Sequence, residues 1–378
     1  MIKILFIHHQ LVCGGAEQAL YDLVCLMDKT KFDITVLVQM EGGMWEQKFR
    51  DAGINVIHYH SCQQKSSLPW VKARNYIKRR QLAAALRKDG EGLIEKCFPE
   101  NYDIVVSYFV WKWMRIGVQK KAKTVYYIHE DAATNASLRD RLTKHRDLLA
   151  SFDQIVRVSK TAANSFSNAT GQTERISAFF NPINSNNIRQ LSTEDPQLPY
   201  DLPIICAVGR LAPEKGFDRL IFIHKRLVDR GLLHRLVIVG DGGEKTHLQT
   251  IVRGLKAEKT VLLTGYSSNP SQYMKRSRFL VCSSYTEGLP VIAMEALSLG
   301  VPIVSSFPSI AELFGESPCG IVTESDDESL EAGIEKMLVD HSFYAQAKAA
   351  AEHRSLFFDG KRMVKDVEQM FIGLLDKD

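Results

Sequence analysis

The sequence predicts an α/β protein of two doubly wound domains, each a parallel sheet with helices on both faces. Short apolar runs alternate with longer stretches whose apolar residues recur at helical spacing, the pattern of repeated strand–helix–strand units. The alternation stops in a polar segment and restarts at residue 204. The length of 378 residues also exceeds one ordinary hydrophobic core and suits two domains.

In the first half, the apolar run Ile2–Ile7 predicts a buried strand. In the stretch that follows, 14–27, Ala16, Leu20 and Val24 share one face of a helix. The other strands expected in this half are 34–38, 56–59, 104–108, 125–128, 155–158 and 176–180, and helices are expected at 44–51 and 70–86.

The segment 184–203 is rich in Ser, Asn, Pro and Asp and has no regular periodicity, so we expect a linker there. It separates a first domain, residues 1–185, from a second, residues 200–357. The stretch 360–375 predicts an amphipathic helix with no strand after it. Strands are expected in the second half at 204–208, 236–239, 261–263, 279–282, 303–304 and 321–322.

Composition excludes several classes of protein. A formal net charge of +4 is too mild to indicate nucleic-acid binding. The seven cysteines are widely spaced and form no C-x-x-C pair, so neither a zinc site nor a redox dithiol is expected. The N-terminal apolar run is too short for a signal peptide, and no run of about 18 apolar residues predicts a membrane span. These features favour a cytoplasmic protein.

The segment TEGLPVIAMEALSLGVPIV, residues 286–304, carries the strongest functional signal. Glu287 follows a predicted strand, Pro290 suits the first turn of a helix, and Glu295 lies within that helix. The helix N-terminus between the two carboxylates offers backbone N–H groups to phosphate. A nucleotide sugar presents the hydroxyls of its sugar, then its diphosphate, then the hydroxyls of its ribose. A carboxylate, an anion site and a second carboxylate match these groups in the same order. Alternatively, Glu287 caps the helix and Glu295 is solvated.

Three further segments follow predicted strands. In VGRLAPEKGFDRL, Arg210 and Lys215 offer two cations that could neutralise a diphosphate, or form a solvated turn. Gly14 and Gly15 in CGGAEQAL let a backbone approach a ligand before a helix opens, although many such pairs are only turns. His129 in VYYIHED could bond a sugar hydroxyl or carry a proton, or be structural. The turn GDGG, residues 240–243, is expected near the base or ribose, or to be purely structural.

Together these segments resemble glycosyltransferase family 4, among the glycosyl transferases group 1. The resemblance covers nearly the whole chain through GGAE, GRLAPEKG, GDGGE and EGLPVIAME with GVPIV, and the two glutamates are eight residues apart. It implies the GT-B fold, in which an acceptor-binding and a nucleotide-sugar-binding domain face each other across a cleft. It also implies that the C-terminal helix, within 358–378, crosses back to the first domain. The catalytic residues implied are His129, Arg210, Lys215 and Glu287, and the donor-binding residues implied are Gly14, Gly15, Gly209, Gly288, Leu289, Pro290 and Glu295.

The activity implied is a retaining, metal-independent transfer of a sugar from a nucleotide diphosphate, expected to be UDP. No cofactor is expected. The acceptor implied is a glycan or lipid-linked glycan of bacterial surface polysaccharide or glycoconjugate synthesis. One departure from the family pattern is SFPSIAE, where Glu312 matches poorly, which leaves the donor sugar open. The alternatives are a sugar-nucleotide epimerase and a non-catalytic GT-B partner subunit; a dinucleotide oxidoreductase lacks its G-x-G-x-x-G fingerprint.

The stretch 70–88, WVKARNYIKRRQLAAALRK, is basic, contains no acidic residue and opens with Trp70. A basic amphipathic helix of this kind can lie on an anionic bilayer. The segment 108–115, YFVWKWMR, adds Trp111 and Trp113. We therefore expect peripheral contact with the cytoplasmic face of a membrane, with packed helices bearing solvated basic faces as the alternative.

Overall fold

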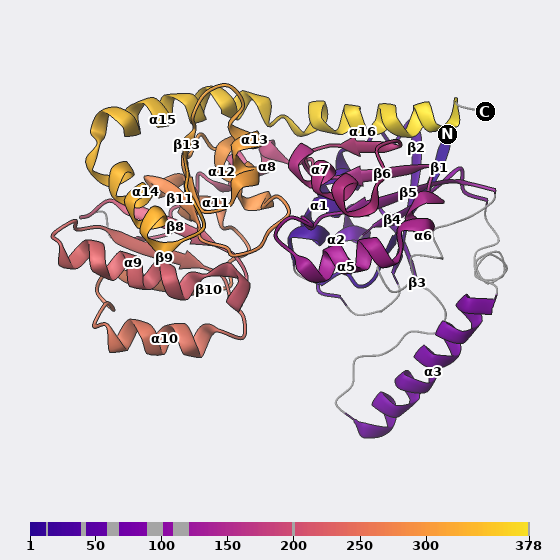
Figure 1. Ribbon diagram of the computed structural model, residues 1–378, viewed down its shortest axis with the longest axis horizontal. Coiled ribbons are helices and arrows are strands. Elements are labelled where there is room, and N and C mark those ends of the chain that lie inside the picture. The colour runs from indigo at the N-terminus through magenta and orange to yellow at the C-terminus, as the bar shows by residue number, and fades with distance from the viewer. Residues whose placement is uncertain are drawn as a thin grey trace. The chain divides into compact units, whose positions relative to one another are not determined.

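The computed structural model describes residues 1–12, 14–38, 43–58, 68–88, 101–108, 121–198 and 201–376. The chain forms two compact units (Figure 1). The first unit is Met1–Pro182 together with Lys361–Asp378, and the second is Ile183–Gly360. Each unit has its own sheet and its own hydrophobic core.

The first unit contains a seven-stranded sheet in the order β3-β2-β1-β4-β5-β6-β7, with parallel pairing throughout. Each strand predicted in this half is present, with its ends shifted by at most two residues. The strands are β1 Ile2–His8, β2 Phe32–Val38, β3 Asn55–His58, β4 Ile104–Tyr108, β5 Lys123–Ile128, β6 Gln154–Arg157 and β7 Ile176–Ala178.

Helix α7 of the first unit has a local sequence signal at each of its ends. Ser159 caps α7 by accepting a bond from the Ala162 amide at 3.0 Å, and Gly171 ends it in the left-handed region with φ of 76°. The helices are α1 Gly15–Leu26, α2 Glu46–Asp51, α3 Pro69–Lys88, α5 Ala136–Lys144, α6 Arg146–Ala150, α7 Lys160–Thr170 and α16 Gly360–Leu375.

The C-terminal helix α16 completes the core of the first unit. Val364, Val367 and Phe371 are buried in the same cluster as Ile4 and Phe6 of β1. This packing confirms the prediction that the C-terminal helix returns to the first domain. The helix lies beside the first unit in Figure 1, where it is yellow.

The second unit contains a six-stranded sheet in the order β10-β9-β8-β11-β12-β13. Its pairing is parallel, and the six strands predicted in this half are present. Its strands are β8 Ile204–Val208, β9 Arg235–Val239, β10 Val261–Gly265, β11 Phe279–Cys282, β12 Ile303–Ser305 and β13 Gly320–Val322. Its helices are α8 Ser185–Leu191, α9 Phe217–Asp229, α10 Lys245–Gly254, α11 Ser271–Arg276, α12 Val291–Ser298, α13 Ala311–Phe314, α14 Asp327–Val339 and α15 His341–Arg354.

The segment 184–203, predicted as an irregular linker, instead begins with helix α8. The Asn184 side chain caps this helix by accepting a bond from the Asn187 amide at 3.2 Å. Arg189 of α8 donates to the carbonyls of Ser298 and Ser355 at 3.3 and 3.1 Å, so the helix is held within the second unit. The second unit accordingly starts at Ile183 and not near residue 200.

Candidate functional site

The order of the strands determines where each sheet can hold a ligand. In both sheets the direction of winding reverses beside the first strand of the unit, between β1 and β4 and between β8 and β11. Ligands of doubly wound sheets bind outside the carboxyl ends of the strands at this switch point. The motifs around Lys215 and Glu287 follow β8 and β11, so they lie at the switch point of the second unit.

Lys215 and Glu287 meet at this edge of the sheet. The Lys215 Nζ donates a hydrogen bond to Glu287 Oε1, and the same oxygen accepts from the Ser284 hydroxyl at 2.9 Å. Both charged side chains are largely buried, with 23% and 16% of their surfaces exposed. The structure therefore brings together two of the four catalytic residues predicted from the sequence. Ser284 was not predicted, although it stands just before the TEGLP motif.

The turn that presents Lys215 is tightly fixed. Residues Pro213–Lys215 form a 3-10 turn, and Gly216 follows in the left-handed region with φ of 60°. A Cβ at Gly216 would lie 2.3 Å from the Ser283 carbonyl oxygen, so only glycine fits there. The Ser283 hydroxyl donates to the Lys215 carbonyl at 2.9 Å, which joins this turn to the loop after β11.

Arg210 is oriented differently from Lys215. Its side chain is 67% exposed and forms an ion pair with Glu214 of the same turn. The structure thus places Arg210 at the same edge of the sheet but does not pair it with Glu287. A surface ion pair of this kind is weak, so the guanidinium can leave Glu214 for a more highly charged partner.

The segment after Glu287 leads directly into helix α12. Gly288, Leu289 and Pro290 are buried, and Pro290 is the N-cap residue rather than the first helical residue. The Pro290 side chain forms no capping hydrogen bond. The Ser309 hydroxyl of the loop after β12 donates to the Gly288 carbonyl at 3.0 Å. Glu295 is half-buried and is the fifth residue of α12, as the sequence predicted.

The GDGG turn packs against the Arg210 turn, a contact that the sequence motifs alone did not indicate. The amide of Leu211 donates to the Asp241 carbonyl at 3.0 Å. A Cβ at Gly240 would lie 1.8 Å from the Gly209 carbonyl oxygen, and a Cβ at Gly242 would lie 2.3 Å from that of Leu211. Because these residues are glycines, the backbones of the loops after β8 and β9 can pack closely against each other.

In the first unit, Gly14 and Gly15 lie at the carboxyl end of β1. Gly14 is the N-cap of α1, and no side-chain hydrogen bond caps this end. A Cβ at Gly14 would lie 2.5 Å from Glu17 Oε2, so the glycine leaves room for that carboxyl group. Glu17 is buried, its pKa is raised to about 7 by the loss of hydration, and its Oε1 lies 3.9 Å from His8 Nε2. Glu17 was not among the site residues predicted from the sequence, although it belongs to the GGAE motif.

His129 follows β5 in the same unit. Its ring lies 4.6 Å from that of Tyr108 and stacks on Tyr127 at 6.0 Å between centroids. Burial, and then the nearby His8, lower the pKa of His129 to about 3. The imidazole is therefore neutral near pH 7, which favours hydrogen bonding over proton transfer among the roles expected for it.

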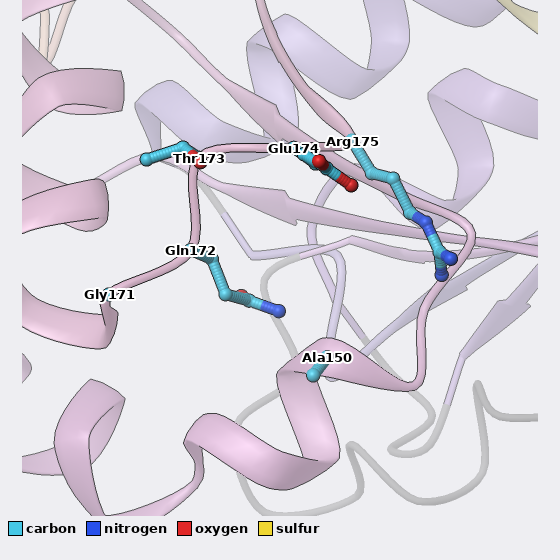
Figure 2. A pocket seen from close by; sticks show the side chains of 6 residues that line it. All are labelled: Ala150, Gly171, Gln172, Thr173, Glu174 and Arg175. Carbon is cyan, nitrogen blue, oxygen red and sulfur yellow. The ribbon is translucent and has the colours of Figure 1, made fainter.

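One predicted feature and one surface hollow lie outside the candidate site. Tyr108, expected in an aromatic surface patch, is a core residue that packs against Phe6, and residues 109–115 lie outside the described part of the chain. A surface hollow of about 300 Å³ is lined by Ala150 and the loop 171–175. Figure 2 labels these lining residues. None of the predicted site residues lines it, so we do not assign it as the functional site.

Two kinds of feature are absent from the residues that the structure describes. Among them, no group of three or more His, Cys, Asp or Glu side chains is arranged to hold a metal ion. Within the same ranges, no helix has the length and apolar character needed to span a bilayer.

The comparisons with known proteins agree with the motifs. Residues 189–354 match the family described as "Glycosyl transferases group 1". For a segment that covers most of the second unit, this match confirms the predicted resemblance to the glycosyl transferases group 1.

Two curated relatives are named as sugar transferases. Over 198 residues the chain is 31% identical to the N-acetylgalactosamine-N,N'-diacetylbacillosaminyl-diphospho-undecaprenol 4-alpha-N-acetylgalactosaminyltransferase of Campylobacter jejuni, covering 52% of this chain and 53% of the relative. It is 24% identical to a putative colanic acid biosynthesis glycosyltransferase, WcaL, of Salmonella typhimurium, covering 63% of this chain and 62% of the relative. The chain thus spans about half to three fifths of the length of these two relatives.

Solved structures share the fold over their full length. The Anabaena protein HepE in complex with UDP superposes with a TM-score of 0.76 at 19% identity, covering 98% of this chain and all of that chain. Sucrose-phosphate synthase of Thermosynechococcus elongatus superposes with a TM-score of 0.76 at 14% identity, covering 100% of both chains. These similarities confirm the predicted fold class, two Rossmann-like units of the GT-B type.

Proposed function

We propose that this protein is a retaining glycosyltransferase that moves a sugar from a nucleotide diphosphate donor to an acceptor. The observation that carries the proposal is the contact of Lys215 with Glu287 and Ser284 at the carboxyl ends of β8 and β11. A cation and a carboxylate at this switch point suit a ligand with both phosphate and hydroxyl groups. The match to group 1 glycosyltransferases covers the same residues.

In this proposal the second unit binds the donor. Lys215 and Arg210 stabilise the departing diphosphate, and Glu287 accepts hydrogen bonds from hydroxyls of the donor sugar. Gly209 and the Gly288–Leu289–Pro290 segment bring backbone close to the donor, and Glu295 bonds the ribose. In the first unit, which receives the acceptor, Gly14 and Gly15 approach the donor phosphate and His129 bonds a sugar hydroxyl.

For retention of configuration, which the family resemblance implies, the assigned groups favour one of two possible routes. A double displacement requires a carboxylate nucleophile beside the anomeric carbon. Glu287 is committed to Lys215 and Ser284, and we assign no other carboxylate to that role. We therefore propose front-face substitution, in which the leaving diphosphate takes the acceptor proton and no metal is needed.

The printed names of the similar proteins suggest the substrates. HepE binds UDP, so we propose a UDP-linked donor for this chain. The Campylobacter relative acts on a diphospho-undecaprenol glycan, and WcaL is named for colanic acid biosynthesis. We accordingly propose a glycan or lipid-linked acceptor in bacterial surface polysaccharide or glycoconjugate synthesis.

A hydrolysis screen tests this function. The purified protein is incubated with UDP-, GDP- and dTDP-sugars, with and without EDTA, and the free nucleotide is measured by chromatography. We expect slow release of UDP from one UDP-sugar, unchanged by EDTA and absent from Lys215→Ala. NMR of the freshly released sugar should show the anomer of the donor.

Other outcomes of the screen would overturn the proposal. Conversion of one UDP-sugar into another without release of UDP would indicate an epimerase. Tight UDP binding with no turnover of any donor, alone or with acceptor glycans, would indicate a non-catalytic partner subunit. Loss of activity in EDTA, restored by Mg²⁺ or Mn²⁺, would contradict metal independence.

Helix α3 supports a second element of the proposal, contact with an anionic membrane at its cytoplasmic face. Trp70 and Ile77 are seven residues apart, so they lie on one side of the helix, and 67% and 55% of their surfaces are exposed. Lys72 and Arg74 are exposed on the same helix, which has no acidic residue. Exposed apolar and basic side chains on one helix suit the interface of an anionic bilayer.

Liposome sedimentation tests the membrane contact. We expect the protein to bind vesicles that contain anionic lipid, with an affinity that falls as salt rises. Lys72→Glu with Arg74→Glu should abolish binding, because each basic residue near the surface contributes about 1 kcal/mol. The matched control is Arg253→Glu, which reverses an exposed charge on α10. Equal sedimentation with neutral and anionic vesicles at low salt would contradict the proposal.

A further inference from the structure

Arg219 is a buried arginine directly beneath the candidate site. It belongs to the first turn of α9, four residues after Lys215, and only 3% of its surface is exposed. Burying a guanidinium is costly unless its donors are satisfied. The hydrogen bonds of Arg219 therefore identify the parts of the structure that it holds together.

The donors of Arg219 reach three different loops. Nε and Nη2 donate to the Ser283 carbonyl at 2.9 and 2.6 Å. Nη1 donates to the Ser325 carbonyl at 2.7 Å, and Nη2 also donates to the Ser306 hydroxyl at 2.5 Å. Ser283, Ser306 and Ser325 lie just beyond the ends of β11, β12 and β13. One side chain thus joins these three loops to the helix that follows β8.

The loop after β11 is the one that carries Glu287. The Ser283 carbonyl oxygen that accepts two bonds from Arg219 is also the atom that a Cβ at Gly216 would meet first. The amide of Tyr285 donates to the Glu214 carbonyl at 2.9 Å, and the Arg219 guanidinium lies 4.3 Å from the centre of the Tyr285 ring. The register between the Lys215 turn and the Glu287 loop therefore depends on the atoms that Arg219 holds.

We propose that Arg219 is a positioning residue, which fixes the loop after β11 so that Glu287 and Lys215 meet in their working arrangement. The inference rests on the proposed function for the meaning of that arrangement. Arg219 acts through the backbone of the loop, because its Nη2 donates to the carbonyls of Ser283 and Ser284. A lysine cannot reproduce this role, because an ammonium lacks the planar fork that serves several acceptors at once.

The test is Arg219→Lys, with Arg278→Lys as the matched control. Arg278 also donates to a backbone carbonyl, that of Met337 at 3.1 Å, and lies 3.9 Å from the centre of the Tyr344 ring. It contacts helices of the same unit and none of the three loops held by Arg219. Both variants are compared with wild type by thermal denaturation, UDP binding and donor turnover.

We expect Arg219→Lys to bind UDP almost as wild type does but to lose roughly 10–100-fold in kcat, the scale of a misplaced catalytic group. Arg278→Lys should keep the kcat of wild type. If Arg219→Lys lost stability but kept wild-type kcat, Arg219 would be purely structural and the proposal would be wrong.

A second readout does not depend on activity. Trace acetylation followed by peptide mass spectrometry reports how well Lys215 is held, with Lys245 of the same unit as the internal reference. We expect Lys215 to become several-fold more reactive in Arg219→Lys and to stay unchanged in Arg278→Lys. Unchanged Lys215 reactivity in Arg219→Lys would refute the positioning role. If wild type turned over no donor but Lys215 still became more reactive in Arg219→Lys, only the proposed function would be refuted.

Discussion

Replacing Lys215 with alanine is expected to lower kcat for donor turnover by about 10²–10³-fold, the effect of losing one preorganised charge partner of a transition state. Lys215 is held by Glu287 in the structure, so its ammonium is already placed before a donor arrives. The negative charge on a leaving diphosphate grows as the bond to the sugar breaks. A cation at that position therefore stabilises the transition state more than the bound donor.

The matched control is Lys225→Ala. Lys225 lies on α9 of the same unit, forms an ion pair with Asp229 and is 26% exposed, close to the 23% of Lys215. It should leave kcat unchanged. Equal losses in the two variants would mean that the effect came from charge or stability rather than from the site, and wild-type kcat in Lys215→Ala would refute the assigned role.

Alanine substitutions of Glu287 and Glu295 should have different kinetic effects in the same assay. Glu287→Ala is expected to lower kcat as Lys215→Ala does, and the double variant should lose less than the sum, because the two side chains are in contact. Glu295→Ala should mainly raise the KM for the donor, since a ribose contact is equal in ground and transition states. Lower kcat with unchanged donor affinity in Glu295→Ala would contradict the ribose assignment.

The sheet architecture could be predicted from the sequence because buried parallel strands leave a direct trace. Ile204–Val208 and Phe279–Cys282 are continuous apolar runs, and the structure has strands at those same residues. Residues just after such runs lie at one edge of the sheet, which was enough to select Lys215 and Glu287. Helix α8 was missed because a seven-residue helix with a polar composition has little apolar periodicity.

The partners of the site residues could not be predicted, because partner choice depends on side-chain direction within loops. From the sequence, Arg210 and Lys215 are equivalent candidates to bind a diphosphate. In the structure, however, Arg210 pairs with Glu214 and Lys215 pairs with Glu287. Arg219 appears in the sequence as an ordinary basic residue of an amphipathic helix. Its burial follows from the three loops that converge on it, and these are distant from it in the chain.

The return of α16 to the first unit makes the stability of that unit depend on the end of the chain. Phe371 is fully buried, and its ring contacts that of Phe6 edge to face with 6.2 Å between centroids. Glu368 of the same helix accepts a bond from the Asp28 amide at 2.6 Å. Removing α16 would therefore expose the core beside β1.

Phe371→Ala is expected to lower the free energy of unfolding of the first unit by roughly 3–5 kcal/mol, the cost of a large cavity in a core. The four tryptophans, Trp45, Trp70, Trp111 and Trp113, all precede residue 183, so tryptophan fluorescence reports this unit and not the second. The fluorescence transition in urea should move to lower concentration. Gln369→Ala, an exposed position on the same helix, should leave it within about 0.5 kcal/mol of wild type. An unshifted fluorescence transition in Phe371→Ala would mean that α16 does not support the first unit in solution.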